Sequence, residues 1–238
     1  MALSLPQLTL ALFDDPYPDL ADYIAGPNTL ALTALMDWAG GGGPWCVLVS
    51  GAPGSGKSHL VQGALRAVND GRERTMYVPL RDVLEYGPAL LDGLDAIDFL
   101  VIDDIDAAAG DPAWERALFD LFNRLHAAER RLLMSASNGP RGSRFVLPDL
   151  SSRLSSALSY RLAELGDDDK QTLLQQRAAR RGLSMPAPVA RYLISRLRRD
   201  MRALNEIFER IDAASLSSGR ELTIPFVRDV LGVDGGSG

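Results

Sequence analysis

The most chemically specific stretch of the sequence is a glycine-rich segment that ends in a lysine and a serine. It matches the pattern G-x-x-x-x-G-K-[ST] at every position: Gly51, Ala52, Pro53, Gly54, Ser55, Gly56, Lys57 and Ser58. Glycines in such a loop let backbone N–H groups turn inward around phosphate, and the N-terminus of the following helix adds a favourable dipole. We therefore expect a nucleotide site in which Lys57 contacts the outer phosphates and Ser58 binds Mg²⁺. The next residue, His59, is included in this cofactor-binding set.

Two carboxylates follow an apolar run at the distance that such a site requires. The residues 99–102 are apolar, and Asp103 and Asp104 come directly after them. We expect Asp103 to be the acid on the metal side and Asp104 to polarise the attacking water. Ser137 stands at the end of the next apolar run, where a polar side chain would contact the γ-phosphate or the water. A simple turn through Ser-Asn-Gly-Pro explains Ser137 equally well.

Apolar runs alternate with helical patterns through the first two thirds of the chain. The runs are too apolar for a strand with one solvent-exposed face. This predicts an α/β fold with a parallel sheet that is covered by helices on both sides. The expected strands are 45–50, 75–79, 98–102 and 131–136. The expected helices are 28–38 with Asn28 as N-cap, 57–68, 81–91 and 111–130.

The sequence becomes entirely helical in pattern after about residue 165, which predicts a small C-terminal lid domain. Helices are expected over 167–181, behind Pro186-Ala187-Pro188, over 200–218 and after Pro225. The predicted organisation is therefore an N-terminal segment, a nucleotide-binding domain, a helical lid and a disordered tail, at 1–15, 16–165, 166–233 and 234–238.

The bulk composition narrows the class of protein. The chain has 238 residues, a hydrophobic fraction of 46% and a net charge of −6, which argues against non-specific adhesion to DNA phosphate. Its single cysteine, Cys46, excludes an internal disulfide and lies in an apolar run. No apolar run reaches the ~20 residues that span a bilayer, and the N-terminus lacks the positive charge of a secretory signal. We expect a cytoplasmic protein whose arginine-rich stretch 177–210 lies on solvated helix faces or touches phosphate or an acidic partner.

The order of these motifs resembles the AAA+ ATPases of the DnaA clade and, within it, the family of DnaA-homologous regulatory inactivators. The segment 147–154 resembles that family's arginine-finger box and implies a finger at Arg153. The segment 200–204 looks like its lid arginine motif and implies that Arg202 reaches the phosphates, and 222–227 resembles its terminal helix. The resemblance covers roughly residues 5–232. It implies ADP or ATP with Mg²⁺ as the cofactor, with ADP as the working ligand.

Three departures from the family pattern bear on activity. The initiator DnaA continues into a helix-turn-helix DNA-binding domain, whereas this sequence stops near Val233, so direct recognition of an origin is not expected. Relatives often have an aspartate where Ser137 stands, and a glutamate is common where Asp104 stands. The resemblance therefore implies weak or no intrinsic ATPase activity.

The N-terminal segment indicates a partner. Its glutamine and apolar residues resemble the short peptide by which bacterial replication proteins dock on the β subunit of the DNA-polymerase sliding clamp: Gln7, Leu8, Leu10, Leu12 and Phe13. An edge strand or a frayed apolar terminus is the alternative.

The resemblance implies a clamp-tethered negative regulator of replication initiation that stimulates ATP hydrolysis by DnaA through a finger supplied in trans. DNA would be contacted indirectly or weakly, no membrane contact is expected, and trans fingers allow homo-oligomers. The alternatives are a helicase-loader-type ATPase of the same clade, a truncated initiator and a metabolic P-loop kinase.

Overall fold

The computed structural model describes residues 19–68, 73–139, 142, 144–196, 201–218 and 222–232. Two compact units are present. The first includes Tyr23, Leu30–Gly51 and Gly56–Leu162, and the second includes Ile24–Thr29, Ala52–Ser55 and the helices that follow Ala163. No helix within the described ranges is long and apolar enough to cross a membrane.

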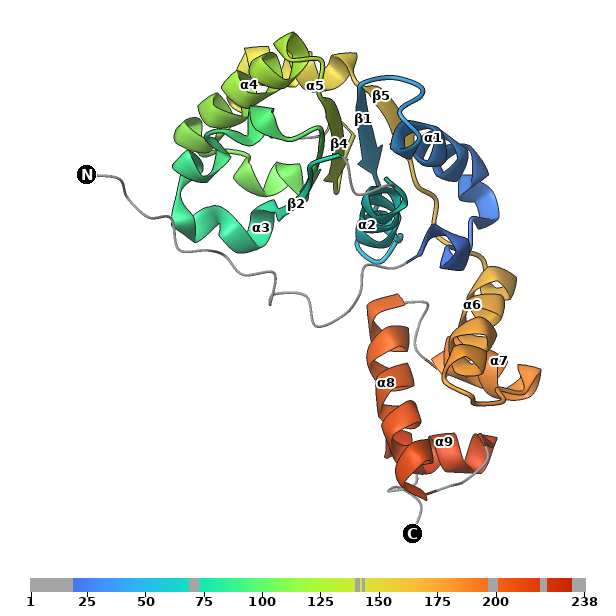
Figure 1. The fold of residues 1–238 in the computed structure, drawn as a ribbon. Coiled ribbons are helices and arrows are strands. Elements are labelled where there is room, and N and C mark those ends of the chain that lie inside the picture. The colour runs from blue at the N-terminus through green and yellow to red at the C-terminus, as the bar shows by residue number, and fades with distance from the viewer. Residues whose placement is uncertain are drawn as a thin grey trace. The chain divides into compact units, whose positions relative to one another are not determined.

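The first unit is built on a five-stranded sheet (Figure 1). The strands are β1 (Cys46–Ser50), β2 (Thr75–Pro79), β3 (Phe99–Asp103), β4 (Arg131–Ala136) and β5 (Leu158–Arg161), in the spatial order β2-β3-β4-β1-β5. All four pairings are parallel. The strand that precedes the glycine-rich loop thus lies inside the sheet, and the carboxyl ends of all five strands meet at one edge. The predicted parallel α/β sheet is confirmed.

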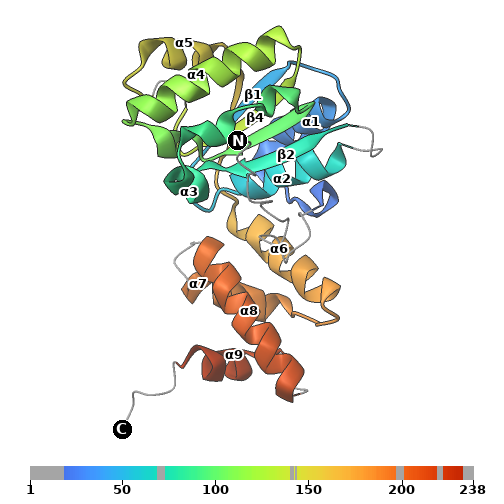
Figure 2. The same ribbon diagram turned by 60° about the vertical axis from the view of Figure 1, so that its left-hand side comes forward.

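Helices cover both faces of this sheet, as Figures 1 and 2 show. The helices of this unit are α1 (Thr29–Ala39), α2 (Lys57–Ala67), α3 (Leu80–Val83), α4 (Pro112–Ala127) and α5 (Pro148–Ser156). Alternate residues of each central strand face opposite cores: Leu48 packs with residues of α4 and α5, and Val49 packs with residues of α1 and α2. Burial on both faces explains why the central strands β1, β3 and β4 are predominantly apolar, whereas the edge strands β2 and β5 are partly exposed. Short 3₁₀ turns connect the elements: η2 (Leu20–Asp22), η3 (Gly26–Asn28), η4 (Leu84–Tyr86), η5 (Pro88–Leu91), η6 (Leu94–Ala96) and η7 (Ile105–Ala108).

Several local expectations need correction. Asn28 does not cap α1, because its side-chain amide donates to the carbonyl of Ala163 (3.0 Å) and accepts from the N–H of Ala163 (2.8 Å). The expected helix over 81–91 is instead one helical turn, α3, followed by 3₁₀ turns, since Gly87 has a positive φ of 82° and Pro88 lacks an N–H. The elements α5 and β5 were not predicted.

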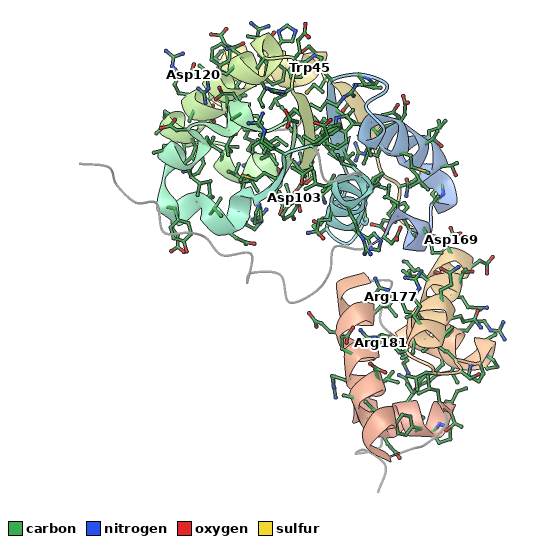
Figure 3. All side chains as sticks on the ribbon, in the orientation of Figure 1. Trp45, Asp103, Asp120, Asp169, Arg177 and Arg181 are labelled. Atoms are coloured by element: carbon green, nitrogen blue, oxygen red, sulfur yellow. The ribbon has the colours of Figure 1, made fainter. Side chains whose placement is uncertain are left out.

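The second unit contains a helical domain that is held by its own core. Its helices are α6 (Asp167–Arg180), α7 (Ala187–Arg196), α8 (Met201–Ser218) and α9 (Ile224–Leu231). Buried residues of all four helices pack together, with Leu174, Leu193, Phe208 and Val227 among them. The end of α6 is closed by Arg181, whose guanidinium pairs with Glu209 and Asp212 of α8. These two ion pairs connect the end of α6 to α8. Figure 3 labels Arg181 there.

Candidate nucleotide site and arginine finger

The glycine-rich loop connects β1 to α2 in the backbone conformation that its glycines permit. Gly54 and Gly56 have φ values of 79° and 90°, which side chains with a Cβ rarely adopt. Lys57 is almost fully buried, and its Nζ donates to the carbonyl of Gly51 at 2.9 Å. Ser58 is exposed in the first turn of α2. The loop therefore presents backbone N–H groups, an ammonium and a hydroxyl at one helix N-terminus, which is the chemistry that binds phosphate.

An aromatic pair lies against the start of α2. A Cβ added at Gly56 would lie 3.3 Å from the ring of Tyr23, so glycine permits this approach. The Tyr23 ring in turn contacts the ring of His59, with centroids 5.6 Å apart and planes inclined by 58°. The imidazole of His59 is half-buried against Tyr23. Its contact with a cofactor stays a prediction.

The carboxylate of Asp103 is held in place by two hydroxyls. It lies at the carboxyl end of β3 (Figure 3), where only 4% of Asp103 is exposed. Tyr77 donates to Oδ2 at 2.6 Å, Ser135 donates to Oδ1, and Gln62 donates to the Tyr77 oxygen at 2.8 Å. Burial raises the pKa of Tyr77, and the charge of Asp103 raises it further. The phenol is therefore a permanent donor to this carboxylate. Neither Tyr77 nor Ser135 was predicted.

Asp104 has a partner that the sequence did not reveal. Its backbone is left-handed, with φ of 53°, and its N–H donates to Ser135 Oγ at 2.9 Å. The carboxylate accepts from Arg81 Nε at 3.1 Å, and this hydrogen bond raises the pKa of Arg81. The structure thus places the expected water-polarising acid beside a guanidinium from the start of α3. A role of Asp104 in hydrolysis stays a prediction.

The ends of β1, β3 and β4 meet, as the predicted site requires. The N–H of Gly51 donates to the carbonyl of Ala136 at 3.2 Å, and the N–H of Ser137 donates to Asp106 Oδ2 at 3.0 Å. Ser137 is therefore fixed by its backbone, with its side chain half-exposed. Asp106 was missed, although it is the third acid in the run Asp103-Asp104-Ile105-Asp106.

Arg153 lies on the exposed face of α5. Leu150 and Leu154 on the opposite face are buried in the core next to α4. Within the described part of the chain, no hydrogen bond or ion pair engages the Arg153 guanidinium. Exposed apolar side chains occur on either side of it in sequence, at Val146 (63% exposed) and Leu158 (44%). The sequence prediction of a finger thus corresponds to a solvent-facing guanidinium on a firmly packed helix.

Some predicted residues lie outside what the structure describes. This applies to the whole segment of Gln7, Leu8, Leu10, Leu12 and Phe13, and to the tail 234–238. Arg202 falls within α8, but its side chain is outside the described residues.

The residues present fit Mg²⁺ held together with a nucleotide. No cluster of three or more metal-ligating His, Cys, Asp or Glu side chains occurs among the described residues. Mg²⁺ bound with a nucleotide needs only one or two protein ligands, because phosphate oxygens and water fill the remaining positions. The hydroxyl of Ser58 and the carboxylate of Asp103, which is already fixed by hydrogen bonds, have the chemistry of such ligands, and their contact with Mg²⁺ stays a prediction.

Comparison with known proteins finds a matching family model for each of two parts of the chain. Residues 88–163 match the family model of the bacterial DnaA ATPase domain, and residues 167–231 match that of the lid domain of Hda. Domain III of the replication initiation protein DnaA from Thermotoga maritima superimposes with a TM-score of 0.80 at 21% identity, over 92% of this chain and 97% of that one.

Two further structures of DnaA show the same fold with a nucleotide analogue. DnaA from Aquifex aeolicus bound to AMPPCP has a TM-score of 0.71 at 20% identity, over 86% of this chain and 68% of that chain. A replication initiator DnaA bound to AMPPCP and single-stranded DNA has a TM-score of 0.70 at 21% identity, over 84% of this chain and 66% of that chain.

The fold is the AAA+ fold of DnaA domain III, and the two family models match separate parts of the chain. The helical lid narrows the resemblance further, because its match is to Hda.

Proposed function

We propose that this protein is a negative regulator of bacterial chromosome replication that stimulates ATP hydrolysis by the initiator DnaA. In this proposal it binds an adenine nucleotide with Mg²⁺ and is tethered to the sliding clamp by Gln7–Phe13. It then places Arg153 at the γ-phosphate of ATP held by DnaA. An Hda-type lid on a DnaA-like AAA+ domain supports this family of functions.

The observation that supports the proposal most strongly is the state of Arg153. A guanidinium that is exposed and free of ion pairs within the described part of its own chain is available to a second molecule. Its helix is anchored by Leu150 and Leu154, so the charge would be presented without much reorganisation. An arginine supplied in trans stabilises the charge of the phosphoryl-transfer transition state and accelerates the reaction by about 10³–10⁵-fold.

The nucleotide in this protein's own site has a structural role in the proposal. The acid expected to polarise water, Asp104, is paired with Arg81. A carboxylate that is occupied by a guanidinium is less available to bind and orient the attacking water, which fits weak or no intrinsic hydrolysis. Bound ADP with Mg²⁺ on Ser58 and Asp103 then keeps the protein in its active form, with Lys57 and Arg202 on the phosphates.

The test is hydrolysis of ATP bound to purified DnaA in the presence of clamp-loaded DNA. Wild-type protein is expected to accelerate ADP formation, and Arg153→Ala is expected to abolish the acceleration. Arg191→Ala is the matched control, because Arg191 is also exposed but lies on α7. Undiminished stimulation by Arg153→Ala refutes the finger assignment.

A separate experiment tests the tether. A pull-down on purified sliding clamp compares the wild type with the double variant Gln7→Ala, Leu10→Ala and with Arg153→Ala. Loss of clamp binding is expected only for the double variant. Undiminished clamp binding by the double variant would refute Gln7–Phe13 as the tether. Absence of clamp binding by the wild type would remove the clamp from the proposal and favour a DnaA-clade ATPase of the helicase-loader type.

A further inference from the structure

A buried carboxylate on α4 accepts hydrogen bonds from the main chain just before α5, the helix that contains Arg153. Glu115 is fully buried, in the first turn of α4. Its Oε2 accepts from the N–H of Leu147 at 2.6 Å, and its Oε1 accepts from the N–H groups of Val146 at 3.0 Å and Gly110 at 2.7 Å. One side chain therefore satisfies three backbone donors from two separate loops.

These bonds fix the start of α5. Leu147 is the N-cap residue of α5, and its own side chain makes no cap hydrogen bond. The Val146 side chain points outward and is 63% exposed, so side-chain burial does not hold this residue. The main chain at 146–147 is therefore held by the Glu115 carboxylate together with the side chains of Phe145 and Leu147, which pack against the core. A buried charge is tolerated only where hydrogen bonds compensate it, and three N–H donors do so here.

The same carboxylate connects α5 to the acids of the nucleotide site. Gly110 ends the short segment that begins at Asp103 and contains η7. Glu115 thereby links that segment to Leu147, the N-cap residue of the nine-residue helix α5. Arg153 lies six residues further along, about 9 Å at the helical rise. A catalytic group must be placed to within about 1 Å to retain the full reaction rate. The contacts that fix the start of α5 therefore affect how well Arg153 can act.

We propose that Glu115 is the positioning residue for the arginine finger. It holds the start of α5 in the register that carries Arg153 to a partner's phosphates, and it makes no contact with the nucleotide itself. This inference rests on the proposed function for its kinetic consequence, but the positioning of α5 is a property of the isolated chain.

The kinetic test compares single and double variants of the full chain. Glu115→Gln keeps the size of the side chain but places an amide donor opposite an N–H. We expect the maximal stimulated rate on DnaA to fall 10-fold or more, with less than threefold change in the half-saturating concentration and in nucleotide affinity. Glu115→Asp keeps the charge on a shorter side chain. Its maximal stimulated rate should lie between those of the wild type and Glu115→Gln. Adding Glu115→Gln to Arg153→Ala should cause no further loss, because both act through one guanidinium.

The matched control is Asp111→Ala. Asp111 caps the same helix by accepting from the N–H groups of Ala113 and Trp114 and does not contact 146–147. It should lower the melting temperature while the stimulated rate stays within twofold. A normal rate for Glu115→Gln, or a further loss in the double variant with Arg153→Ala, overturns the inference.

Hydrogen exchange of the isolated protein separates this inference from the proposed function. Amides of 144–153 should exchange at least 10-fold faster in Glu115→Gln and in Glu115→Asp, but not in Asp111→Ala. Unchanged exchange refutes the positioning role whatever DnaA does. Faster exchange together with no stimulation by the wild type would refute the proposed function and leave the anchoring of α5 established.

Discussion

Removing one hydroxyl from Tyr77 should destabilise the α/β unit measurably. The Tyr77→Phe change keeps the ring between its neighbours but deletes the 2.6 Å donor to the Asp103 carboxylate. A hydrogen bond to a charged group contributes about 1.5–3 kcal/mol to stability. The carboxylate is almost fully buried, so water does not readily replace the lost donor. We expect a loss of about 2 kcal/mol, or about 4–8 °C in Tm.

The assay is thermal and urea unfolding followed by circular dichroism, without nucleotide. Tyr86→Phe is the matched control, because Tyr86 is 60% exposed and the same hydroxyl is removed there without loss of a described hydrogen bond. The control should stay within about 0.5 kcal/mol of the wild type. Equal stability of the two phenylalanine variants would refute the claim that Tyr77 holds Asp103.

The same change should alter the response to alkali. The folded pKa of Tyr77 is raised above its unfolded value of about 10, because burial and the Asp103 charge oppose the phenolate. This contribution to stability is complete below pH 10 and is lost as the pH rises further, when only the unfolded chain ionises. Between pH 10 and 11 the wild type should therefore lose more stability than Tyr77→Phe. Parallel curves would contradict this sign.

Further predictions concern other sites. Asp98→Asn should cost about 1 kcal/mol, since the Asp98 side chain pairs with Arg74 and Arg130. The hydrogen bond to Arg74 is the main cause of the lowered pKa of Asp98, so the stability from this pair is present above pH 4 and is lost on acidification. Urea unfolding at pH 7 and pH 3 should show this loss for the wild type but not for Asp98→Asn. Cys46 should react with a thiol reagent only upon unfolding, because burial raises its pKa to about 12; rapid labelling of the native protein would contradict its placement. Lys57→Ala should weaken nucleotide binding about 10–100-fold by titration calorimetry, and an unchanged affinity would exclude the loop as the phosphate site.

The sequence predicted those features that depend on local pattern. The strands 75–79 and 131–136 were placed at their observed residues, because each is an apolar run with a sharp boundary. The glycine-rich loop was recognised because its chemistry requires contiguous residues. In contrast, β5 is a four-residue edge strand, Leu-Ser-Tyr-Arg, that is mostly exposed and has no continuous apolar run. The short helix α5 was missed for a similar reason, since only Leu150 and Leu154 mark its buried face.

The missing parts of the candidate site depend on pairing between distant segments. Tyr77 reaches Asp103 because Pro79 pairs with Asp103 in the register of β2 and β3, and no local pattern encodes that register. From the sequence, Glu115 looks like an ordinary exposed helix residue. Its role depends on a hydrogen bond from Val146, 31 residues later in the chain. Such contacts arise from the topology of the sheet and its connections.

The most direct test of the central claim is the single-turnover rate of ATP hydrolysis on DnaA at saturating concentrations of this protein. Saturation removes differences in docking, so the rate reports only the completed hydrolytic site. We predict that Arg153→Ala lowers this limiting rate by at least 10³-fold, with the half-saturating concentration little changed. The same limiting rate reached at a higher concentration would contradict the account, because Arg153 would then be a docking residue and the catalytic charge would come from elsewhere.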